Sequence, residues 1–282
     1  MQEGSTLYKH SMLKEGSLEG KVAIITGGAT GLGKAMALEF ARLGANIVIA
    51  SRNKENLTKA EEEISKLGTK VLSVQTDVRV PDQVNNLVQS TVEQFGEVHI
   101  LVNNAAGNFR VKTMDMSVNA WNAVINIVLN GTFYCSQAVG RQMAKQGSGG
   151  AILNIGSVHA WTGSPLTAHS AAAKAGVLAL TKTLAVEWAP YQIRTNMIAP
   201  GPIADTGAVT QLWPTPEDAS LILNNIPAQR FGHLQEIANL AAYLVSDYAS
   251  YVSGACYVVD GAGWLNKGKY QLGESRKIGM GD

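Results

Sequence analysis

Charged residues and cysteines are scarce in this sequence. Only 16% of its 282 residues are charged, whereas 46% are hydrophobic, and this balance excludes an intrinsically disordered chain. Cys135 and Cys256 lie far apart and form no CxxC pair, which argues against a disulfide scaffold and a thiolate metal site. The five histidines form neither an HExxH motif nor a His/Cys cluster, so we expect no bound metal.

The sequence also lacks an excess of either charge. Its 23 Lys and Arg against 22 Asp and Glu leave a net charge of +1, which gives no field to attract nucleic acid or an anionic membrane. The first eighteen residues hold no signal-peptide run, and no later window supplies the ~18 apolar residues of a membrane span. The chain ends in Met280-Gly281-Asp282, which is not the S-K-L peroxisomal signal. We expect a cytoplasmic protein that binds neither membrane nor nucleic acid.

Strand-like and helix-like segments alternate along the chain. Short runs rich in Val and Ile are each followed by a segment with helical apolar spacing, and glycines at 44, 68 and 96 end the first three helices. This pattern predicts an α/β fold with a doubly wound parallel sheet of the Rossmann type and helices on both faces. The expected strands are 21–26, 46–51, 70–76, 99–103, 151–156, 193–199 and 255–260, and the later helices are about 118–145, 168–188 and 234–246.

One domain accounts for the whole pattern. Strands and helices never separate into blocks, and α/β domains often reach ~250 residues. We expect residues 1–18 and 267–282 to be tails and residues 19–266 to form the domain. The long irregular segments, 157–167 and 200–220, are candidate active-site loops.

A glycine-rich motif, TGGATGLG at 26–33, follows the first expected strand and opens a helix. In this context glycines allow a tight turn and close approach of the backbone to a pyrophosphate, whose charge meets the helix N-terminus. The motif therefore predicts a dinucleotide site.

The end of the second expected strand indicates which nicotinamide cofactor binds. It reads Ala50-Ser51-Arg52, without the acidic residue that usually holds a ribose 2′-hydroxyl. Arg suits a 2′-phosphate, so NADP(H) is favoured. In the alternative, Arg52 is a solvated charge and Glu55 takes the ribose. Asp77, after the third strand, meets the adenine or caps the helix opened by Pro81.

Four segments together resemble the short-chain dehydrogenase/reductase family over about residues 19–264: TGGATGLG, NNAAG (103–107), a Lys in a long helix, and PGPI (200–203). Most members carry Tyr-x-x-x-Lys, in which Tyr protonates a carbonyl oxygen. Here Ser170 stands four residues before Lys174, and none of the eight tyrosines has a Lys at i+4. An ordinary alcohol dehydrogenase or ketoreductase is therefore disfavoured.

A narrower resemblance is to the 2,4-dienoyl-CoA reductases, especially bacterial ones. It rests on NNAAGNF (103–109), residues 119–137, HSAAAKAGV (169–177), LAVEWAP (184–190) and APGPI (199–203). The resemblance implies that NADPH delivers hydride to a conjugated dienoyl-CoA thioester in unsaturated fatty acid β-oxidation, that residues about 200–222 form an acyl-substrate loop, and that the chain is a homotetramer.

The same resemblance implies the catalytic roles. Asn108 and the residue at 159 would donate hydrogen bonds to the thioester oxygen, as in an oxyanion hole. The family has Tyr at the second position, whereas this chain has His159, whose ring N–H can also donate. Lys174 would bind the nicotinamide ribose, and Ser170, on the same helix face, would act as a relay. We expect neighbouring His169 to pack.

Substrate and cofactor contacts complete the expected site. Substrate contacts implied by the resemblance are Arg79, Phe109 and Ser117, while Gln211 stands where a basic residue is usual, a loss for which Arg110 and Lys112 are possible compensation. The expected cofactor contacts are Gly27, Thr30, Gly31, Leu32, Gly33, Ser51, Arg52, Asp77, Val78, Asn104, Ala105, Lys174, Pro200, Gly201 and Ile203. Two alternatives stay open: reduction of a trans-2-enoyl-CoA or a non-CoA carbonyl with His159 as the acid, and a catalytically weak NADP(H)-binding protein.

Overall fold

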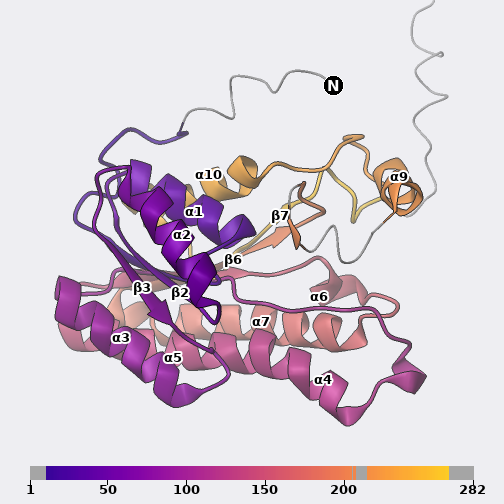
Figure 1. The fold of residues 1–282 in the computed structure, drawn as a ribbon, viewed down its shortest axis with the longest axis horizontal. Coiled ribbons are helices and arrows are strands. Elements are labelled where there is room, and N and C mark those ends of the chain that lie inside the picture. The colour runs from indigo at the N-terminus through magenta and orange to yellow at the C-terminus, as the bar shows by residue number, and fades with distance from the viewer. Residues whose placement is uncertain (1–10, 205, 208–214, 267–282) are drawn as a thin grey trace, which may run out of the picture.

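Seven parallel strands form the centre of the computed structural model, which describes residues 11–204, 206–207 and 215–266 (Figure 1). Their order in the sheet is β3-β2-β1-β4-β5-β6-β7, so the chain reverses its direction of winding between β1 and β4. This confirms the expected doubly wound parallel sheet. The strands are β1 (Val22–Thr26), β2 (Asn46–Ser51), β3 (Val71–Gln75), β4 (Ile100–Asn103), β5 (Gly150–Ile155), β6 (Ile193–Pro200) and β7 (Cys256–Val259).

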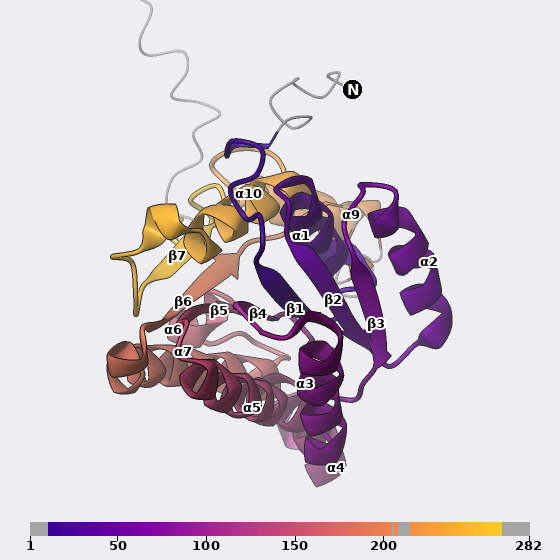
Figure 2. The same ribbon diagram turned by 90° about the vertical axis from the view of Figure 1, so that its left-hand side faces the viewer.

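Helices cover both faces of this sheet (Figure 2). One face carries α1 (Gly31–Arg42), α2 (Lys54–Ser65) and α10 (Leu234–Val245). The other carries α3 (Pro81–Phe95), α5 (Gly131–Gln146) and α7 (Ala168–Glu187). Helix α4 (Val118–Ile125) runs into α5 through a π-helical turn, Asn126–Asn130. Short 3₁₀ turns occupy Thr113–Asp115, Ala189–Tyr191 and Asp247–Ala249.

The apolar runs become strands because both sides of the sheet are covered. All five residues of β1 are buried, and alternate residues enter different clusters, with Ile25 facing α1 and Ile24 facing α3 and α5. Each such side chain contributes about 1.5–3 kcal/mol by leaving water. Leu18, at the end of the expected N-terminal tail, is also fully buried, and its N–H donates to the Leu43 carbonyl (2.9 Å).

Two helices lie in segments that the sequence analysis left irregular. Helix α6 (His159–Thr162) interrupts 157–167, and α9 (Pro216–Asn224) begins inside the expected substrate loop and ends just beyond it. One is a single turn and the other barely exceeds two, so neither carries enough periodicity to be recognised. Gln211 and the tails beyond 11 and 266 lie outside the described residues. Within the described part, no helix is long and apolar enough to cross a membrane.

Candidate active site

The carboxyl ends of the parallel strands all meet at one edge of the sheet, and the expected site residues follow these ends. The glycine turn follows β1, Arg52 follows β2, Asp77 follows β3, and the segment with Asn108 follows β4. His159 lies just after β5. This edge, at the reversal between β1 and β4, is where open α/β sheets bind ligands.

The glycine turn after β1 is packed too closely to accept side chains. A Cβ on Gly33 would lie 2.2 Å from the Gly27 carbonyl oxygen, and one on Gly27 would lie 2.8 Å from Asn104 Nδ2. The Asn104 amide donates to the carbonyls of Thr26 (3.0 Å) and Gly27 (3.3 Å). The side chain of Asn104 therefore holds the turn in shape from the neighbouring strand.

The start of α1 suits the pyrophosphate of a dinucleotide. Gly31 has a φ of +51° with open space where a Cβ would lie, and Thr30, at the N-cap, makes no side-chain hydrogen bond to the helix. In the described structure no N-cap side chain accepts from the first N–H groups of α1, and these groups coincide with the positive end of the helix dipole. This cradle fits the nicotinamide cofactor of the family.

The end of β2 presents a cation and no free carboxylate. Arg52 is exposed directly after β2. Asn53 caps α2 by accepting from the Asn56 N–H (2.9 Å). Glu55, the alternative ribose ligand, pairs with Lys59 at 2.6 Å, which directs its carboxylate along the helix.

Asp77 forms an ion pair with Arg79. Its Oδ1 accepts from Arg79 Nε (2.9 Å) and its Oδ2 from Arg79 Nη2 (2.5 Å). These bonds to the guanidinium lower the pKa of Asp77. Val80, not Asp77, is the N-cap of α3, and no side chain caps that helix. The helix-capping alternative for Asp77 is therefore wrong, because its carboxylate turns to Arg79.

The other expected cofactor contacts also follow the strand ends. Gly201 leaves no room for a Cβ, which would lie 2.6 Å from Asp260 Cβ. Ile203 is buried and bridges to Gly232, and Val78 is buried against Gly131. The remaining positions, at least partly accessible, are Leu32, Ser51, Ala105 and Pro200.

Lys174 on α7 reaches the end of β5. Its Nζ donates to the Ile155 carbonyl oxygen at 2.5 Å. Burial lowers the pKa of Lys174 to about 8, because the ammonium form is poorly solvated there. A perturbed amine at the ligand-binding edge of such a sheet is a mark of a functional site.

Three expected catalytic side chains at this edge of the sheet have donors that the described part of the chain leaves unused. The Oδ1 of Asn108 accepts from its neighbour, the Phe109 N–H (2.9 Å), while its Nδ2 meets no protein acceptor there. The His159 ring and the Ser170 hydroxyl likewise make no hydrogen bond with the described residues, and all three side chains are half-buried. Burial lowers the pKa of His159, so its ring is neutral at pH 7 and carries one N–H donor.

The expected substrate residues are separated in the structure. Phe109 lies next to Asn108 and is half-buried against α7. Ser117 caps α4 by accepting from the Ala120 N–H (3.1 Å). Arg79 is engaged by Asp77, and Arg110 and Lys112 are exposed on the segment after β4. Among these described residues, Phe109 is the one that packs against α7, the helix that carries Lys174.

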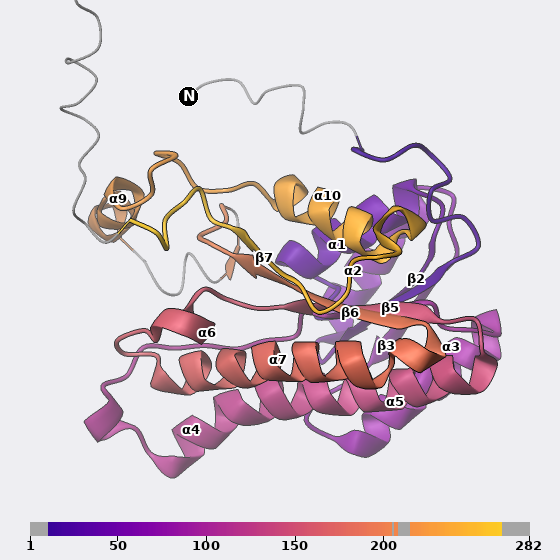
Figure 3. The same ribbon diagram turned by 180° about the vertical axis from the view of Figure 1, so that it is seen from behind.

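Two contacts near this site escaped the sequence analysis. Trp161 on α6 and Trp264 after β7 lie with ring centroids 5.8 Å apart, although they are far apart in the chain. Figures 1 and 3 show α6 and α9 at the same end of the molecule. His169 is fully buried with its ring 4.6 Å from that of Phe109. No local pattern marks either contact, because both depend on tertiary packing.

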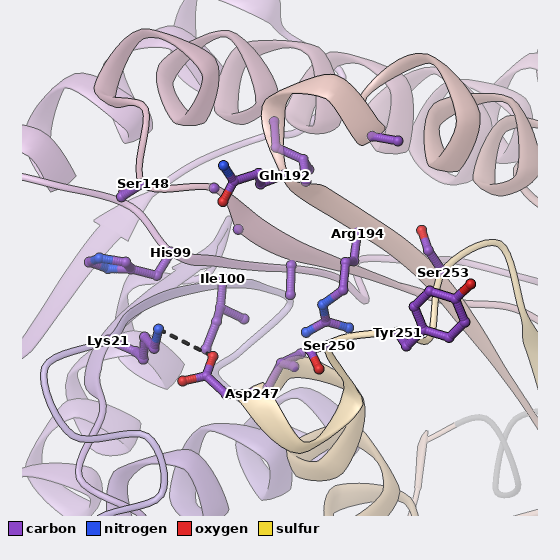
Figure 4. A pocket seen from close by; sticks show the side chains of 16 residues that line it. Lys21, His99, Ile100, Ser148, Gln192, Arg194, Asp247, Ser250, Tyr251 and Ser253 are labelled. Carbon is purple, nitrogen blue, oxygen red and sulfur yellow. Dashed lines mark ion pairs between the residues drawn. The ribbon is translucent and has the colours of Figure 1, made fainter.

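A separate pocket of about 520 Å³ lies at the amino ends of the strands (Figure 4). Its polar groups are paired: Lys21 lies 3.5 Å from Asp247, and His99 Nε2 lies 2.9 Å from the Glu97 carboxylate. Arg194 donates to three backbone carbonyls, those of Leu244, Ser246 and Val252. This pocket is at the opposite edge from the glycine turn and Lys174.

Known proteins resemble the chain over most of its length. Residues 27–263 match a family model described as enoyl-(acyl carrier protein) reductase. A Bacillus subtilis protein described as a probable 2,4-dienoyl-CoA reductase is 47% identical over 88% of this chain and 98% of its own length. A peroxisomal 2,4-dienoyl-CoA reductase of Danio rerio is 39% identical over 94% of this chain and 87% of its own.

Solved structures agree with these matches. A short-chain dehydrogenase from Bacillus anthracis is 49% identical, with a TM-score of 0.81, covering 89% of this chain and 99% of that one. A citronellol catabolism dehydrogenase of Pseudomonas aeruginosa is 33% identical, with a TM-score of 0.80, covering 90% and 99%. The resemblance found in the sequence motifs is thereby confirmed. The chain belongs to the short-chain dehydrogenase/reductase family of oxidoreductases.

Proposed function

We propose that this protein is an NADPH-dependent reductase of 2,4-dienoyl-CoA thioesters. The observation that carries the proposal is the pair of half-buried donors, the Asn108 amide and the His159 imidazole, which follow β4 and β5 and have no acceptor in the described chain. The 47% identity to the Bacillus subtilis relative supports the substrate class.

The reaction needs donors where negative charge develops. Bound NADPH supplies the hydride, which adds to the far end of the conjugated diene and moves electron density to the thioester oxygen. Asn108 Nδ2–H and the His159 ring N–H hold that oxygen. Such an arrangement stabilises the transition state by about 3–4 kcal/mol per donor when water is excluded. The dienolate then takes a proton from solvent on carbon.

Lys174 and Ser170 complete the site from helix α7. The ammonium of Lys174 binds the nicotinamide ribose, and its positive potential favours the anionic dienolate. Its bond to the Ile155 carbonyl fixes where the amine lies. Ser170 lies one helical turn before Lys174, so its hydroxyl relays hydrogen bonding between the amine and bound ligands.

The preference for NADPH rests on Arg52. Its exposed guanidinium follows β2, and two carboxylates nearby are already paired, Glu55 with Lys59 and Asp77 with Arg79. A guanidinium can bind a 2′-phosphate by two charge-assisted hydrogen bonds. Asp77 meets the adenine from the end of β3. We expect the glycine turn, Val78, Asn104, Ala105, Pro200, Gly201 and Ile203 to line the rest of the cofactor.

Other parts of the proposal depend on the relatives. Phe109 supports an acyl chain, and Arg79 and Ser117 bind the CoA portion of the thioester. The roles in unsaturated fatty acid β-oxidation and in a homotetramer remain predictions. So does the cytoplasmic location, since peroxisomal enzymes are among the relatives.

A substrate panel tests the proposal. The purified chain is mixed with NADPH or NADH and with hexa-2,4-dienoyl-CoA, a trans-2-enoyl-CoA or a simple ketone, and absorbance at 340 nm is followed. We expect fast loss of absorbance with the dienoyl-CoA and NADPH. Turnover of the enoyl-CoA or ketone alone would support the alternative in which His159 acts as an acid. Cofactor binding without any turnover would support a binding protein.

A further inference from the structure

His169 is a buried titratable group that the proposed chemistry does not use. Its exposed fraction is 0%, and its Nε2 has no hydrogen-bond partner among the described residues. Its Nδ1 accepts from the Ser170 N–H at 2.7 Å. Burial lowers the pKa of His169, and a backbone hydrogen bond with Thr167 opposes that shift. A buried ring nitrogen without a partner is destabilising, and an apolar side chain at this position would avoid that cost. The imidazole therefore calls for an explanation beyond space filling.

One side of the His169 ring contacts the segment that carries Asn108. The ring meets Phe109 at a centroid distance of 4.6 Å and an interplanar angle of 79°, an edge-to-face geometry that aromatic pairs favour. The Phe109 N–H in turn donates to Asn108 Oδ1 at 2.9 Å. The position of Phe109 thus fixes the direction in which the Asn108 amide presents its free Nδ2–H.

The Nδ1 side of the His169 ring bonds to the backbone at the start of helix α7. Ser170 lies in the first turn, where N–H groups have no partner within the helix, and His169 Nδ1 supplies the acceptor. Lys174 follows on the next turn. A backbone bond from the Val111 N–H to the Leu166 carbonyl (2.8 Å) joins the same two segments further out.

We propose that His169 is a positioning residue that sets the Asn108 amide at a fixed place relative to Lys174, by packing against Phe109 while bonding to the backbone of Ser170. This inference rests on the proposed function, in which Asn108 and Lys174 act on one bound substrate. Correct placement matters because a misplacement of about 1 Å can cost roughly 100-fold in rate.

Two substitutions separate the two contacts of His169. His169→Asn keeps an acceptor beside the Ser170 N–H, as Asn108 does for Phe109, but removes the ring. His169→Phe keeps a ring against Phe109 but removes the acceptor. We expect His169→Asn to lower kcat about tenfold or more, with the Kd for NADPH, measured by fluorescence titration, unchanged. We expect His169→Phe to keep most of kcat and to lower the melting temperature, because the Ser170 N–H loses its partner.

A double-mutant cycle tests whether His169 acts through Asn108. If it does, His169→Asn lowers kcat far less in an Asn108→Ala background than in the unchanged enzyme. Phe109→Leu, which changes no residue of α7, should lower kcat about as much as His169→Asn does. The double variant His169→Asn/Phe109→Leu should lose little more kcat than either single variant. Equal fold-losses from His169→Asn with and without the Asn108 amide would overturn the proposal, as would full activity of His169→Asn.

His99 offers a matched control. Its Nδ1 also accepts a backbone N–H, that of Val22 (3.1 Å), but at the opposite edge of the sheet. His99→Asn should lower stability and leave kcat unchanged, and a similar loss of kcat in this variant would reduce the His169 effect to general destabilisation. Absence of dienoyl-CoA turnover by the unchanged enzyme would count against the proposed function alone, and the cycle would then be measured with the substrate that is turned over.

Discussion

The two edges of the sheet differ in whether their polar side chains have partners within the chain. At the amino edge, Lys21 and His99 are paired with acids, and Arg194 bonds three backbone carbonyls. At the carboxyl edge, Asn108 and His159 keep free donors in the described structure. Both edges hold half-buried nitrogen groups, so burial alone does not separate them.

The difference shows which polar groups serve the fold and which are left for a ligand. A half-buried donor without an acceptor costs free energy in the empty protein, and a ligand that accepts from it recovers that cost. Paired groups have already gained their stabilisation within the chain. The large pocket at the amino edge is therefore the weaker candidate for chemistry, despite its volume of about 520 Å³. Five predictions test this contrast.

Lys174→Ala should have the largest effect. It removes the cation at the carboxyl edge, so kcat should fall about 1,000-fold and NADPH binding should weaken. Steady-state kinetics and fluorescence titration measure the two effects. An unchanged kcat would contradict the assignment of Lys174.

His159→Phe should lower kcat for dienoyl-CoA about 100-fold, because it removes one donor to the thioester oxygen. His159→Tyr is the matched variant: it restores the residue typical of related enzymes and should hold or raise kcat. A large loss in the Tyr variant would mean that the pocket is shaped around an imidazole.

The pH should move activity and stability in opposite directions above pH 8. The pKa of Lys174 is about 8 in the folded chain against 10.5 ordinarily, so the required cation is lost above pH 8 and kcat/KM should fall about tenfold per unit. Between about pH 8 and 10.5 the unfolded chain binds more protons at this group, so the free energy of unfolding contributed by Lys174 rises with pH. Urea titrations of the unchanged chain and of Lys174→Met, compared across this pH range, isolate the contribution of Lys174 to the free energy of unfolding. A pH profile of kcat/KM that is flat to pH 10 would contradict the expected loss of the cation.

Arg52→Ala should raise the KM for NADPH about tenfold or more and leave the KM for NADH nearly unchanged, because only the first cofactor carries a 2′-phosphate. Lys54→Ala, two residues along on the same surface, serves as the control for a general loss of positive charge. Equal effects of Arg52→Ala on both cofactors would remove the basis for the NADPH preference.

Arg194→Ala should affect activity least. It leaves carbonyls at the end of α10 without their donor, so the free energy of unfolding should fall by about 1–3 kcal/mol while kcat stays unchanged. Thermal or urea unfolding with parallel kinetics measures both. A loss of kcat without a loss of stability would place chemistry at the amino edge and break the contrast.

Strand positions were predictable because buried parallel strands need continuous apolar runs, as in VAIIT at β1. The cofactor turn was predictable because its glycines follow a strand and open a helix. The helices α6 and α9 were missed because they are short. The contacts of His169 with Phe109 and of Trp161 with Trp264 join segments distant in the chain, and the pairing of Asp77 with Arg79 depends on side-chain direction. No local pattern specifies these.

The π-helical turn at Asn126–Asn130 has a consequence for the position of α7 along its axis. Leu129 in this turn lies against Gly176, where a Cβ would come within 2.8 Å of the leucine side chain. The Leu129 side chain of this π-helical turn packs directly onto the backbone of Gly176, two residues beyond Lys174. This contact opposes sliding of α7 along its own axis, and so it adds to the Ile155 bond in holding the Lys174 amine at its depth.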